Sequence, residues 1–558
     1  TDATGQLLWD KYIGRNTHWD EGADLTLTAD GGVAIAGVNS LAAVFINDVT
    51  LVKADLQGRV KTNYFVGQVF FDKNQDCTHD SGEPGLEGWI LKAIGADGEV
   101  YASTDATGRY AMRLEMGEYD LVLVPKNAYW SACIDTFHNV QVTEAYDSLT
   151  FDFPVHEAVS CPALQVDVSA GAAVVCASNT WVVSYCNEGP VDAASVRVDV
   201  VLGRGLTFEG ASVNPALVQD SLVRFELGAL ASGDCGRFTL DAFMDCEAVA
   251  GQVAEVRAHI FPDSICLPAN PAWDGASIRV TGRCDADSVR FTIENMGQGD
   301  PVQPLRYIVI EDVILRSEQS HQTASGQSMA LAFPRNGATW RLVAEQSPHH
   351  PGHSYPTVAV EGCVDTGTPF TTGVVTQFPE DENDLFRAVD VQESVLAAAD
   401  APLLRGYPKG YGDSMYVTNT TEIDYLIRFE NASEDTVTRV VIRDTLSPWL
   451  LPETVEKGAS SHPYELQVYD QGIVKIVIED VILASSSPGS GPSGGFVQFR
   501  ISQKPDNAPG THIYNRAVAY VGYEAPVPSE QTLHIVEGTS LTDFLLVTGV
   551  AGPTVPGV

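Results

Sequence analysis

Residues 72–83 carry oxygen-bearing side chains at the spacing of a twelve-residue calcium loop. In such a loop, hard oxygen ligands surround one Ca²⁺, and a Glu at the last position closes it with both carboxylate oxygens. Cys77 stands at position 6, where the pattern has a glycine for its sharp turn. The alternative is a solvated acidic turn without a metal. The ligand set predicted by the spacing is Asp72, Asn74, Asp76, Thr78 (through its backbone carbonyl), Asp80 and Glu83.

The segments that hold this calcium loop are predicted to be strands. Residues 65–71 and 88–94 are rich in β-branched and aromatic residues, and neither has the spacing of an amphipathic helix. An EF-hand needs a helix on each side of its loop. We therefore expect a rigid connection between two strands and not a switch that opens a pair of helices.

Residues 65–158, which contain the loop, resemble the calcium-binding B-type repeats of bacterial surface adhesins, within the wider Cna-B-like group of sandwiches. The likeness rests on the loop ligands and on the sequence Gly85-Leu86-Glu87-Gly88 that follows them. It implies a β-sandwich with Ca²⁺ as its cofactor. Some members of that group carry Lys–Asn isopeptide crosslinks, but this segment has no convincing set of Lys, Glu and Asn.

Composition narrows the classes of partner. The 558 residues leave room for roughly four domains. The 33 basic and 73 acidic residues give a net charge of −40. Such a surface repels phosphate backbones and anionic lipid heads, so we expect no nucleic-acid partner. The sequence has no run of about 18 apolar residues, so it predicts no membrane insertion.

The ten cysteines lie between Cys77 and Cys363. An even number at irregular spacings favours disulfides in an oxidising compartment over zinc sites, and so an extracellular or cell-surface location. The alternative is a set of buried free thiols in a cytosolic protein. Sequence alone does not determine the pairing. The pairs we consider are Cys77 with Cys133, Cys235 with Cys246, and Cys266 with Cys284.

Residues 1–64 contain short strands separated by Asp-Gly and Gly turns, as expected for propeller blades. The phrases at 30–37 and 48–58 resemble bacterial secreted propeller repeats. Only one full blade and part of another are present, so we predict a partial β-propeller blade segment. Because a blade cannot bury both faces alone, we expect the chain to begin inside a longer protein or the missing blades to come from elsewhere.

From residue 161 onward one pattern occurs three times: an alternating strand, a polar turn with an asparagine, and a second alternating strand. The asparagines are Asn187, Asn295 and Asn431. Such alternation is typical of one sheet of an antiparallel sandwich that has one buried face. The predicted sandwiches are residues 159–267, 268–365 and 400–538, with a linker at 366–399.

These three segments resemble the Ig-like conserved-repeat domains of large bacterial surface proteins. The last one is similar to the sandwich near the C-terminus of large secreted proteins of the Bacteroidota group, through phrases such as Tyr425–Asn431, Arg443–Leu446 and Asn515–Ala517. Those proteins usually end in a type IX secretion sorting domain. The resemblance therefore implies that residues 539–558, rich in Pro and Gly, are a linker to a missing sorting domain.

The residues that could form a catalytic set are better explained as ordinary turns and strands. His349, His350 and His353 have a metal-like spacing, but the prolines and glycine around them indicate a turn. Ser461 stands beside His462, but neighbours in a strand point to opposite faces. The motifs of serine hydrolases, zinc proteases and nucleotide-binding enzymes are absent from the sequence. We therefore predict that the chain is not an enzyme.

Together these patterns predict an all-β chain of tandem Ig-like β-sandwich domains, preceded by the propeller-like segment. We expect a secreted cell-surface structural or adhesive protein that forms a stalk or part of a filament or other surface appendage, stiffened by Ca²⁺ and disulfides. Its expected partners are other copies of itself, other surface proteins, or cell-surface glycans. The alternative is a non-catalytic accessory region, such as a carbohydrate-binding one, of a larger secreted hydrolase.

Overall fold

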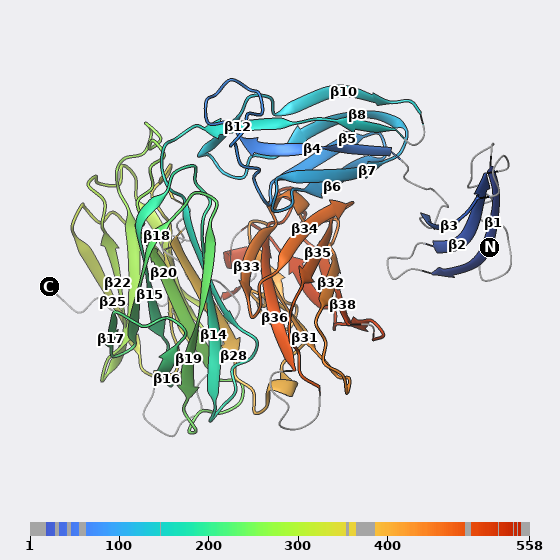
Figure 1. The fold of residues 1–558 in the computed structure, drawn as a ribbon. Helices are drawn as coiled ribbons and strands as arrows, with labels where there is room; N and C mark the ends of the chain where they lie inside the picture. Colours follow the sequence, from blue (N-terminus) through green and yellow to red (C-terminus); the bar gives the residue numbers. More distant parts are fainter. Residues whose placement is uncertain are drawn as a thin grey trace.

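The computed structural model describes residues 18–27, 33–41, 46–54, 63–144, 147–352, 356–363, 386–485, 493–522, 524–539, 541–543 and 545–547. Within these ranges the regular elements are strands and three short 3-10 helices, η2 (Ala398–Asp400), η3 (Pro452–Thr454) and η4 (Leu541–Asp543). The predicted all-β fold is confirmed, and Figure 1 shows the strands gathered into several sandwiches. In this part of the chain no helix has the length and apolar character needed to cross a bilayer.

The N-terminal part is a three-stranded antiparallel sheet in the order β1-β2-β3. Its strands are β1 (His18–Leu27), β2 (Val33–Leu41) and β3 (Ile46–Ala54). The order is compatible with part of a propeller blade. The propeller itself stays a prediction, because the described residues include no second blade.

The first sandwich spans residues 63–157 and holds the predicted calcium loop, residues 72–83, between β4 and β5. One sheet contains β10-β8-β5-β6, and the other has the order β11-β4-β12-β9 with β7 also paired to β4. Phe65, Leu121 and Phe153 are buried between them. The loop is therefore flanked by strands, as predicted. The strands are β4 (Asn63–Phe71), β5 (Ile90–Gly95), β6 (Gly98–Ser103), β7 (Arg109–Leu114), β8 (Gly117–Leu123), β9 (Trp130–Ala132), β10 (Thr136–Val142), β11 (Ser148–Thr150) and β12 (Phe153–Glu157).

The second sandwich packs the sheet β13-β14-β19-β16 against the sheet β17-β18-β15-β20-β28. Its strands are β13 (Leu164–Ala170), β14 (Ser178–Asn187), β15 (Ala193–Leu202), β16 (Leu206–Ala211), β17 (Leu217–Gln219), β18 (Leu222–Leu230), β19 (Cys235–Met244), β20 (Val253–Phe261) and β28 (Arg387–Glu393). The last strand falls in the range predicted as a linker, 366–399. Because β28 pairs with β20 along its whole length and buries Ala388 and Val391, this stretch is not a linker.

The third sandwich has sheets in the orders β21-β22-β25 and β27-β26-β23-β24-β41. Its strands are β21 (Ile278–Cys284), β22 (Ser288–Asn295), β23 (Leu305–Glu311), β24 (Ile314–His321), β25 (Ser328–Pro334), β26 (Trp340–Ala344), β27 (Thr357–Val360) and β41 (Leu546–Val547). The short β41 comes from the range predicted as a C-terminal linker, and it pairs in parallel with β24.

The C-terminal sandwich contains the largest apolar core, with Tyr425, Ile442, Ile476 and Phe499 among its fully buried residues. Its sheets are β29-β31-β36-β33, β30-β40-β37 and the run β34-β35-β32-β38-β39. The strands are β29 (Leu404–Tyr407), β30 (Tyr416–Val417), β31 (Ile423–Glu430), β32 (Val440–Thr445), β33 (Glu456–Ser460), β34 (Glu465–Asp470), β35 (Ile473–Ile478), β36 (Gly494–Ile501), β37 (His512–Asn515), β38 (Ala517–Val521), β39 (Val527–Pro528) and β40 (Thr532–Val536).

The two strands of each repeated unit lie in different sheets. β14 pairs with β13 and β19, whereas β15 pairs with β18 and β20. The pairs β22 and β23, and β31 and β32, are divided in the same way. The prediction that each unit forms one sheet is therefore wrong. Alternation shows which face of a strand is buried, and not which sheet the strand joins.

A fully buried asparagine stands at each of these crossings, namely Asn187, Asn295 and Asn431. Each donates from Nδ2 to the carbonyl oxygen four residues ahead, at 2.7–2.9 Å. Each also accepts at Oδ1 the backbone N–H two residues ahead, at 3.0–3.2 Å. The side chain thus satisfies backbone groups at the point where the chain leaves one sheet for the other.

The C-terminal sandwich contacts each of the other three. Its β34 pairs with β6, so one nine-stranded sheet runs through the first and C-terminal sandwiches. Val182 of the second sandwich packs on Leu426, Ala459 and Phe496. Tyr411 donates to the carbonyl of Asp312 in the third, at 3.0 Å. The expected stalk, with domains in a row on short linkers, is therefore not the arrangement observed (Figure 1).

Candidate functional site

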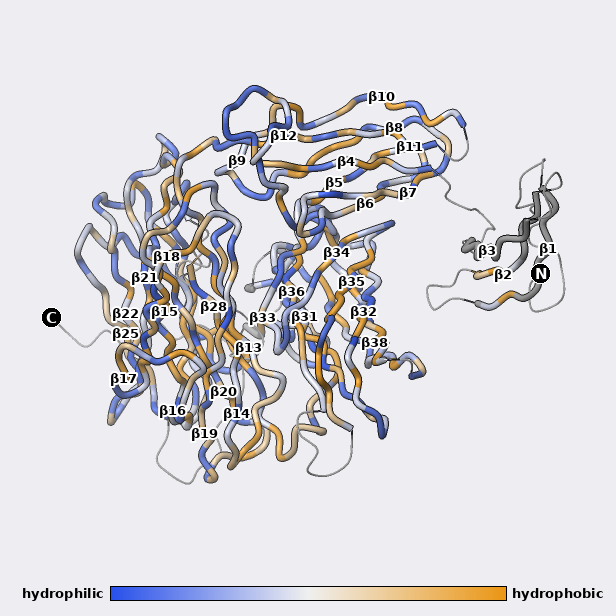
Figure 2. The backbone as a smooth tube through the Cα atoms, in the orientation of Figure 1, coloured by the Kyte–Doolittle hydropathy of each residue, from blue (hydrophilic) through white to orange (hydrophobic). Residues whose placement is uncertain are grey.

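The calcium loop begins where β4 ends, and its first residue is fixed by buried contacts. Asp72 is fully buried, and its backbone N–H donates to the carbonyl of Val155 at 2.8 Å. Its carboxylate accepts the N–H groups of Asp76 and Cys77, at 3.2 and 2.9 Å. Residues 73–82 are exposed, Glu83 is half-buried, and the loop forms part of a hydrophilic stretch in Figure 2.

Glu83 closes the loop. One carboxylate oxygen accepts the N–H of Lys73 at 3.0 Å, and the other accepts the N–H of Asp80 at 2.9 Å. The predicted last ligand therefore lies back against the start of the loop, as a bidentate closing residue must.

Asn74 lies between the acidic side chains of the loop. Its amide nitrogen donates to Asp76 at 3.0 Å and to Asp80 at 2.9 Å. Thr78 donates to Asp76 from both its hydroxyl and its backbone, which lowers the pKa of that carboxyl. The amide N–H₂ thus occupies the place between two carboxylates where a cation would lie.

The donor set fits Ca²⁺ in chemistry, with one adjustment. Among the described residues, no three carboxylates of the loop bring their oxygens within 4.8 Å of one another. Turning the Asn74 amide would present its oxygen in place of its nitrogen and let Asp76 and Asp80 approach a shared ion. All the side chains that the sequence predicted as ligands, and Thr78, lie on this one loop.

Cys77 takes the backbone conformation that the calcium-loop pattern assigns to glycine. Its φ is +62°, in the left-handed region, and Gln75 also has a positive φ of +59°. The side chain of Cys77 is bonded to Cys133, which follows β9. The N–H of Cys133 donates to the carbonyl of Pro154 at 3.0 Å. The disulfide therefore ties the sharp turn of the loop to the framework of the first sandwich.

All ten cysteines are paired. The bond between Cys77 and Cys133 is the one that the sequence suggested, whereas the other two pairings considered, Cys235 with Cys246 and Cys266 with Cys284, are wrong. The observed bonds join positions 49 to 105 residues apart, which only the strand topology brings together. They are Cys161–Cys266, Cys176–Cys246, Cys186–Cys235 and Cys284–Cys363.

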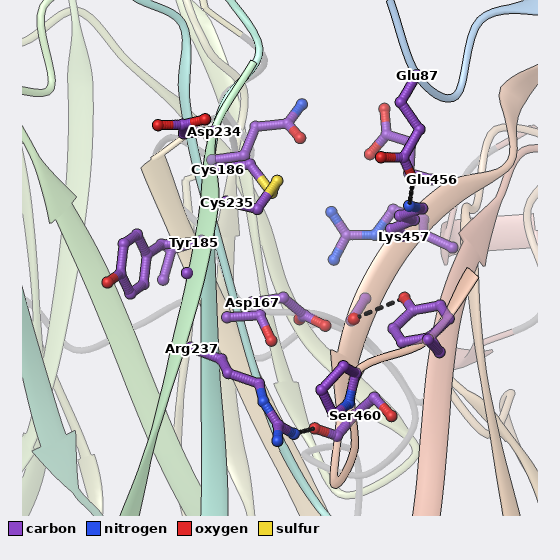
Figure 3. Close-up of a pocket in the computed structure, with 18 of the residues that line it drawn as sticks. Glu87, Asp167, Tyr185, Cys186, Asp234, Cys235, Arg237, Glu456, Lys457 and Ser460 are labelled. Atoms are coloured by element: carbon purple, nitrogen blue, oxygen red, sulfur yellow. Dashed lines mark hydrogen bonds and ion pairs between the residues drawn. A yellow bond between two sulfur atoms is a disulfide. The ribbon is translucent and has the colours of Figure 1, made fainter. Parts of the chain in front are cut away.

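A cavity of about 640 Å³ lies between the second and the C-terminal sandwiches. Figure 3 shows Asp167 and Arg237 on one side facing Lys457 and Ser460 on the other. Arg237 donates to the carbonyl of Ser460 at 3.1 Å. Glu87, from the first sandwich, forms an ion pair with Lys457 at the edge of the same cavity. Three sandwiches therefore meet here.

Three carboxylates in this cavity share one guanidinium. Arg500 donates twice to Asp424, at 2.9 and 3.3 Å, and the charges of Asp167 and Glu456 also act on it. Asp167 accepts the backbone N–H of Ala459 at 2.5 Å. Burial, and then the charge of Asp424, raises the pKa of Asp167 to about 7. Asp424 and Glu456 are the cross-strand partners of Arg500 within one sheet, and only Asp167 is added by domain packing. No sequence signal indicated this group, because strand pairing and domain packing cannot be read from the local pattern.

Ser461 and His462 differ from their expected arrangement. The Ser461 hydroxyl and His462 Nδ1 lie 2.9 Å apart, because both residues follow the end of β33 and sit in a bend. The hydroxyl also contacts the backbone N–H and carbonyl of Phe496, at 2.8 and 3.1 Å. These contacts hold the bend against β36. His353 lies outside the described residues.

A family model described as a domain of unknown function (DUF7619) matches residues 408–535, within the C-terminal sandwich. No curated protein matches the chain. Similar solved structures include the full-length RrgB pilus protein of Streptococcus pneumoniae, at 8% identity and a TM-score of 0.22, which covers 89% of this chain and 99% of that one. We draw no conclusion from likenesses with so low a TM-score.

Two further solved structures are similar at the same level. BcpA, the major pilin subunit of Bacillus cereus, has 11% identity and a TM-score of 0.17, covering 54% of this chain and 95% of that one. The collagen adhesin of Staphylococcus aureus has 8% identity and a TM-score of 0.17, covering 68% of this chain and 93% of that one. They too carry no argument about this chain.

Proposed function

We propose that this chain belongs to an extracellular, cell-surface protein with a structural or adhesive role. The observation that supports it most strongly is the pairing of all ten cysteines. Disulfides form and persist in oxidising environments and are rare in the cytosol. Outside the cell, a protein is exposed to mechanical load and to proteases, and chaperones are not there to refold it. A chain of repeated β-sandwiches with five disulfides suits such a compartment.

The proposed role is presentation without chemistry of its own. The C-terminal sandwich contacts the three others through a shared sheet, an apolar cluster and a tyrosine hydrogen bond. Such contacts resist bending between domains, which otherwise move freely on their linkers. The proposed partners are other copies of the chain, other surface proteins or cell-surface glycans.

Ca²⁺ is proposed as a stiffening ligand of the first sandwich. Asp72, Asn74, Asp76, Asp80 and Glu83 would hold it with side-chain oxygens, and Thr78 with its carbonyl. The ion would neutralise the acidic loop and so favour the folded loop by mass action, by about 2.7 kcal/mol at a Ca²⁺ concentration one hundred times the Kd.

Thermal unfolding with Ca²⁺ and with EDTA tests this proposal. Ca²⁺ should raise the Tm of the wild-type chain by several degrees, and the variant Asp72→Ala/Glu83→Ala should lose the rise. The matched control, Asp97→Ala/Glu144→Ala, removes two exposed carboxylates elsewhere on the same sandwich and should keep it. An equal rise of the Tm with Ca²⁺ in both double variants would show that this loop is not the Ca²⁺ site.

Location is tested separately on intact cells of the organism that makes the protein. An added protease should remove the chain from unbroken cells, and thiol labelling without reductant should find no free cysteine. Protection from the protease together with ten reactive thiols would overturn the surface location, whatever the result with Ca²⁺.

A further inference from the structure

Five polar side chains meet inside the C-terminal sandwich, within the region matched by the domain of unknown function. They come from β31, β32, β37 and β40, and so from all three sheets of this sandwich. We call them the inner polar cluster; its members are Tyr425, Asp444, Asn515, Thr532 and His534.

Contacts join these residues into one group. Asn515 donates from Nδ2 to Asp444 at 2.8 Å. Asn515 and Thr532 are directly opposite each other in the pairing of β37 with β40. The ring of Tyr425 meets that of His534 edge-on, with centroids 6.2 Å apart. Burial, followed by the charge of Asp444, raises the pKa of the Tyr425 phenol.

Three members have a buried polar atom without a hydrogen-bond partner, and Tyr425 and Thr532 interact with each other through their hydroxyls. The three atoms are Asp444 Oδ1, Asn515 Oδ1 and His534 Nδ1. Tyr425 and Asp444 are 0% exposed, and Asn515 and His534 are 1% exposed. A buried polar group left unpaired is costly, so three such acceptors in one cluster call for a small polar guest.

The unpaired atoms favour a guest with positive charge. His534 Nε2 lies 3.0 Å from the carbonyl of Pro408, so this nitrogen carries the proton and Nδ1 is an acceptor. The carboxylate and amide oxygens are also acceptors. One hydroxyl of Tyr425 and Thr532 donates to the other, so a single O–H remains for these three acceptors.

The charge of Asp444 also favours a positively charged guest. Burial raises its pKa to about 7, and only the hydrogen bond from Asn515 opposes the shift. Among the described residues, no basic side chain lowers the pKa of Asp444. An ionised Asp444 is therefore a buried charge without a counterion, which is costly until a cation or a proton neutralises it.

We propose that the inner polar cluster is a binding site for a monovalent cation. One carboxylate balances one positive charge, and the remaining ligands are neutral oxygens together with the imidazole nitrogen of His534. A ligand set made mostly of oxygens suits a hard ion such as Na⁺. The bound ion would connect three sheets of the C-terminal sandwich. This site is separate from the calcium loop, and neither depends on the other.

Hydrogen exchange of the full chain at about pH 8, in EDTA, tests the site. NaCl is compared with choline chloride at equal ionic strength, because choline is too large to enter. Amides of β31, β32 and β40 should exchange roughly tenfold more slowly at a Na⁺ concentration ten times the Kd. Strands of the second sandwich serve as the internal reference.

Two variants locate the effect. Asp444→Asn keeps the shape but removes the charge, and it should exchange equally in the two salts. Asp435→Asn removes an exposed carboxylate of the same sandwich and should keep the Na⁺ effect. Crystals of the wild-type chain soaked in thallium acetate give a test that needs no variant, with an anomalous peak expected beside Asp444.

Equal exchange of the wild-type chain in NaCl and choline chloride would overturn the proposal. Loss of protection with rising pH in both salts would show that a proton neutralises Asp444, which also overturns it. The absence of a thallium peak beside Asp444 would do the same.

Discussion

The second and the C-terminal sandwiches share the same asparagine-centred repeat, but they are held together in different ways. Two disulfides, Cys176–Cys246 and Cys186–Cys235, bond the second sandwich, and Cys161–Cys266 joins the segments before β13 and after β20 beside the core of the first sandwich. The C-terminal sandwich has no cysteine and has instead the largest apolar core, to which Ile90 and Tyr101 of the first sandwich also belong. The second sandwich therefore has disulfides in addition to an apolar core, whereas the C-terminal sandwich relies on burial alone.

The difference follows from chain connectivity. The second sandwich is completed by β28, which the chain reaches only after forming the third sandwich. Its own contiguous part, β13 to β20, thus folds with one sheet edge unpaired. Disulfides that restrict the unfolded state compensate for this late strand. All strands of the C-terminal sandwich follow one another in sequence.

Reduction of the disulfides should have the largest effect. With a phosphine reductant, the second sandwich should lose about 2–5 kcal/mol of stability for each bond broken, enough to unfold it. The strands of the C-terminal sandwich should stay protected. Hydrogen exchange with and without reductant measures both regions at once, and equal loss of protection in both would contradict the comparison.

The substitution Phe499→Ala should destabilise the C-terminal sandwich and leave the second sandwich folded, the opposite of the effect of reduction. Phe499 is fully buried in the C-terminal core, so its loss should cost about 3–5 kcal/mol there while the disulfide-bonded second sandwich remains folded. Tyr514→Ala, at a side chain 46% exposed, is the control and should change stability little. Unfolding in urea, followed by exchange of each sandwich, gives the result.

Removing a crossing asparagine should cost less, and the cost should depend on the sandwich. Asn187→Ala and Asn431→Ala each leave buried backbone groups unpaired, for about 2–3 kcal/mol. The disulfides should keep the second sandwich folded in Asn187→Ala, whereas Asn431→Ala should lower the Tm of the C-terminal sandwich. Equal melting of the two sandwiches in both variants would argue against separate means of support.

The smallest expected effect is a pH dependence of the contact between these two sandwiches. The pKa of Asp167 rises from 3.8 to about 7, so the docked state binds the proton more tightly than the undocked one. The contact should therefore be strongest below about pH 4 and weaken as the pH rises to about 7. Small-angle scattering across this range should show the change, and Asp167→Asn should abolish it.

The sequence predicted the features that depend on neighbours along the chain. Alternation located the strands on both sides of residues 72–83, whereas the calcium site that the oxygen spacing indicates on their connection stays a prediction. The sequence also picked out Asn187, Asn295 and Asn431, although not their buried role. In each case the signal extends over a few residues, which is the range over which periodicity and turn chemistry act.

The features missed depend on contacts between distant parts of the chain. The pairing of Cys161 with Cys266, the return of β28 to the second sandwich, and the cavity around Asp167 all join residues far apart in sequence. A strand pattern does not state its partner, so sheet membership and domain docking cannot be read from it. For this reason the prediction of a stalk of domains in a row, made from the tandem repeats, was wrong.

The junction between β6 and β34 has only two paired positions, Tyr469 with Ala102 and Asp470 with Tyr101. Under a pulling force, this junction should separate before either sandwich loses a strand, once Ile90 and Tyr101 leave the C-terminal core. The molecule would then lengthen in a first, reversible step and recoil when the load is released. A protein built in this way would extend under a sudden load while its individual sandwiches stay folded.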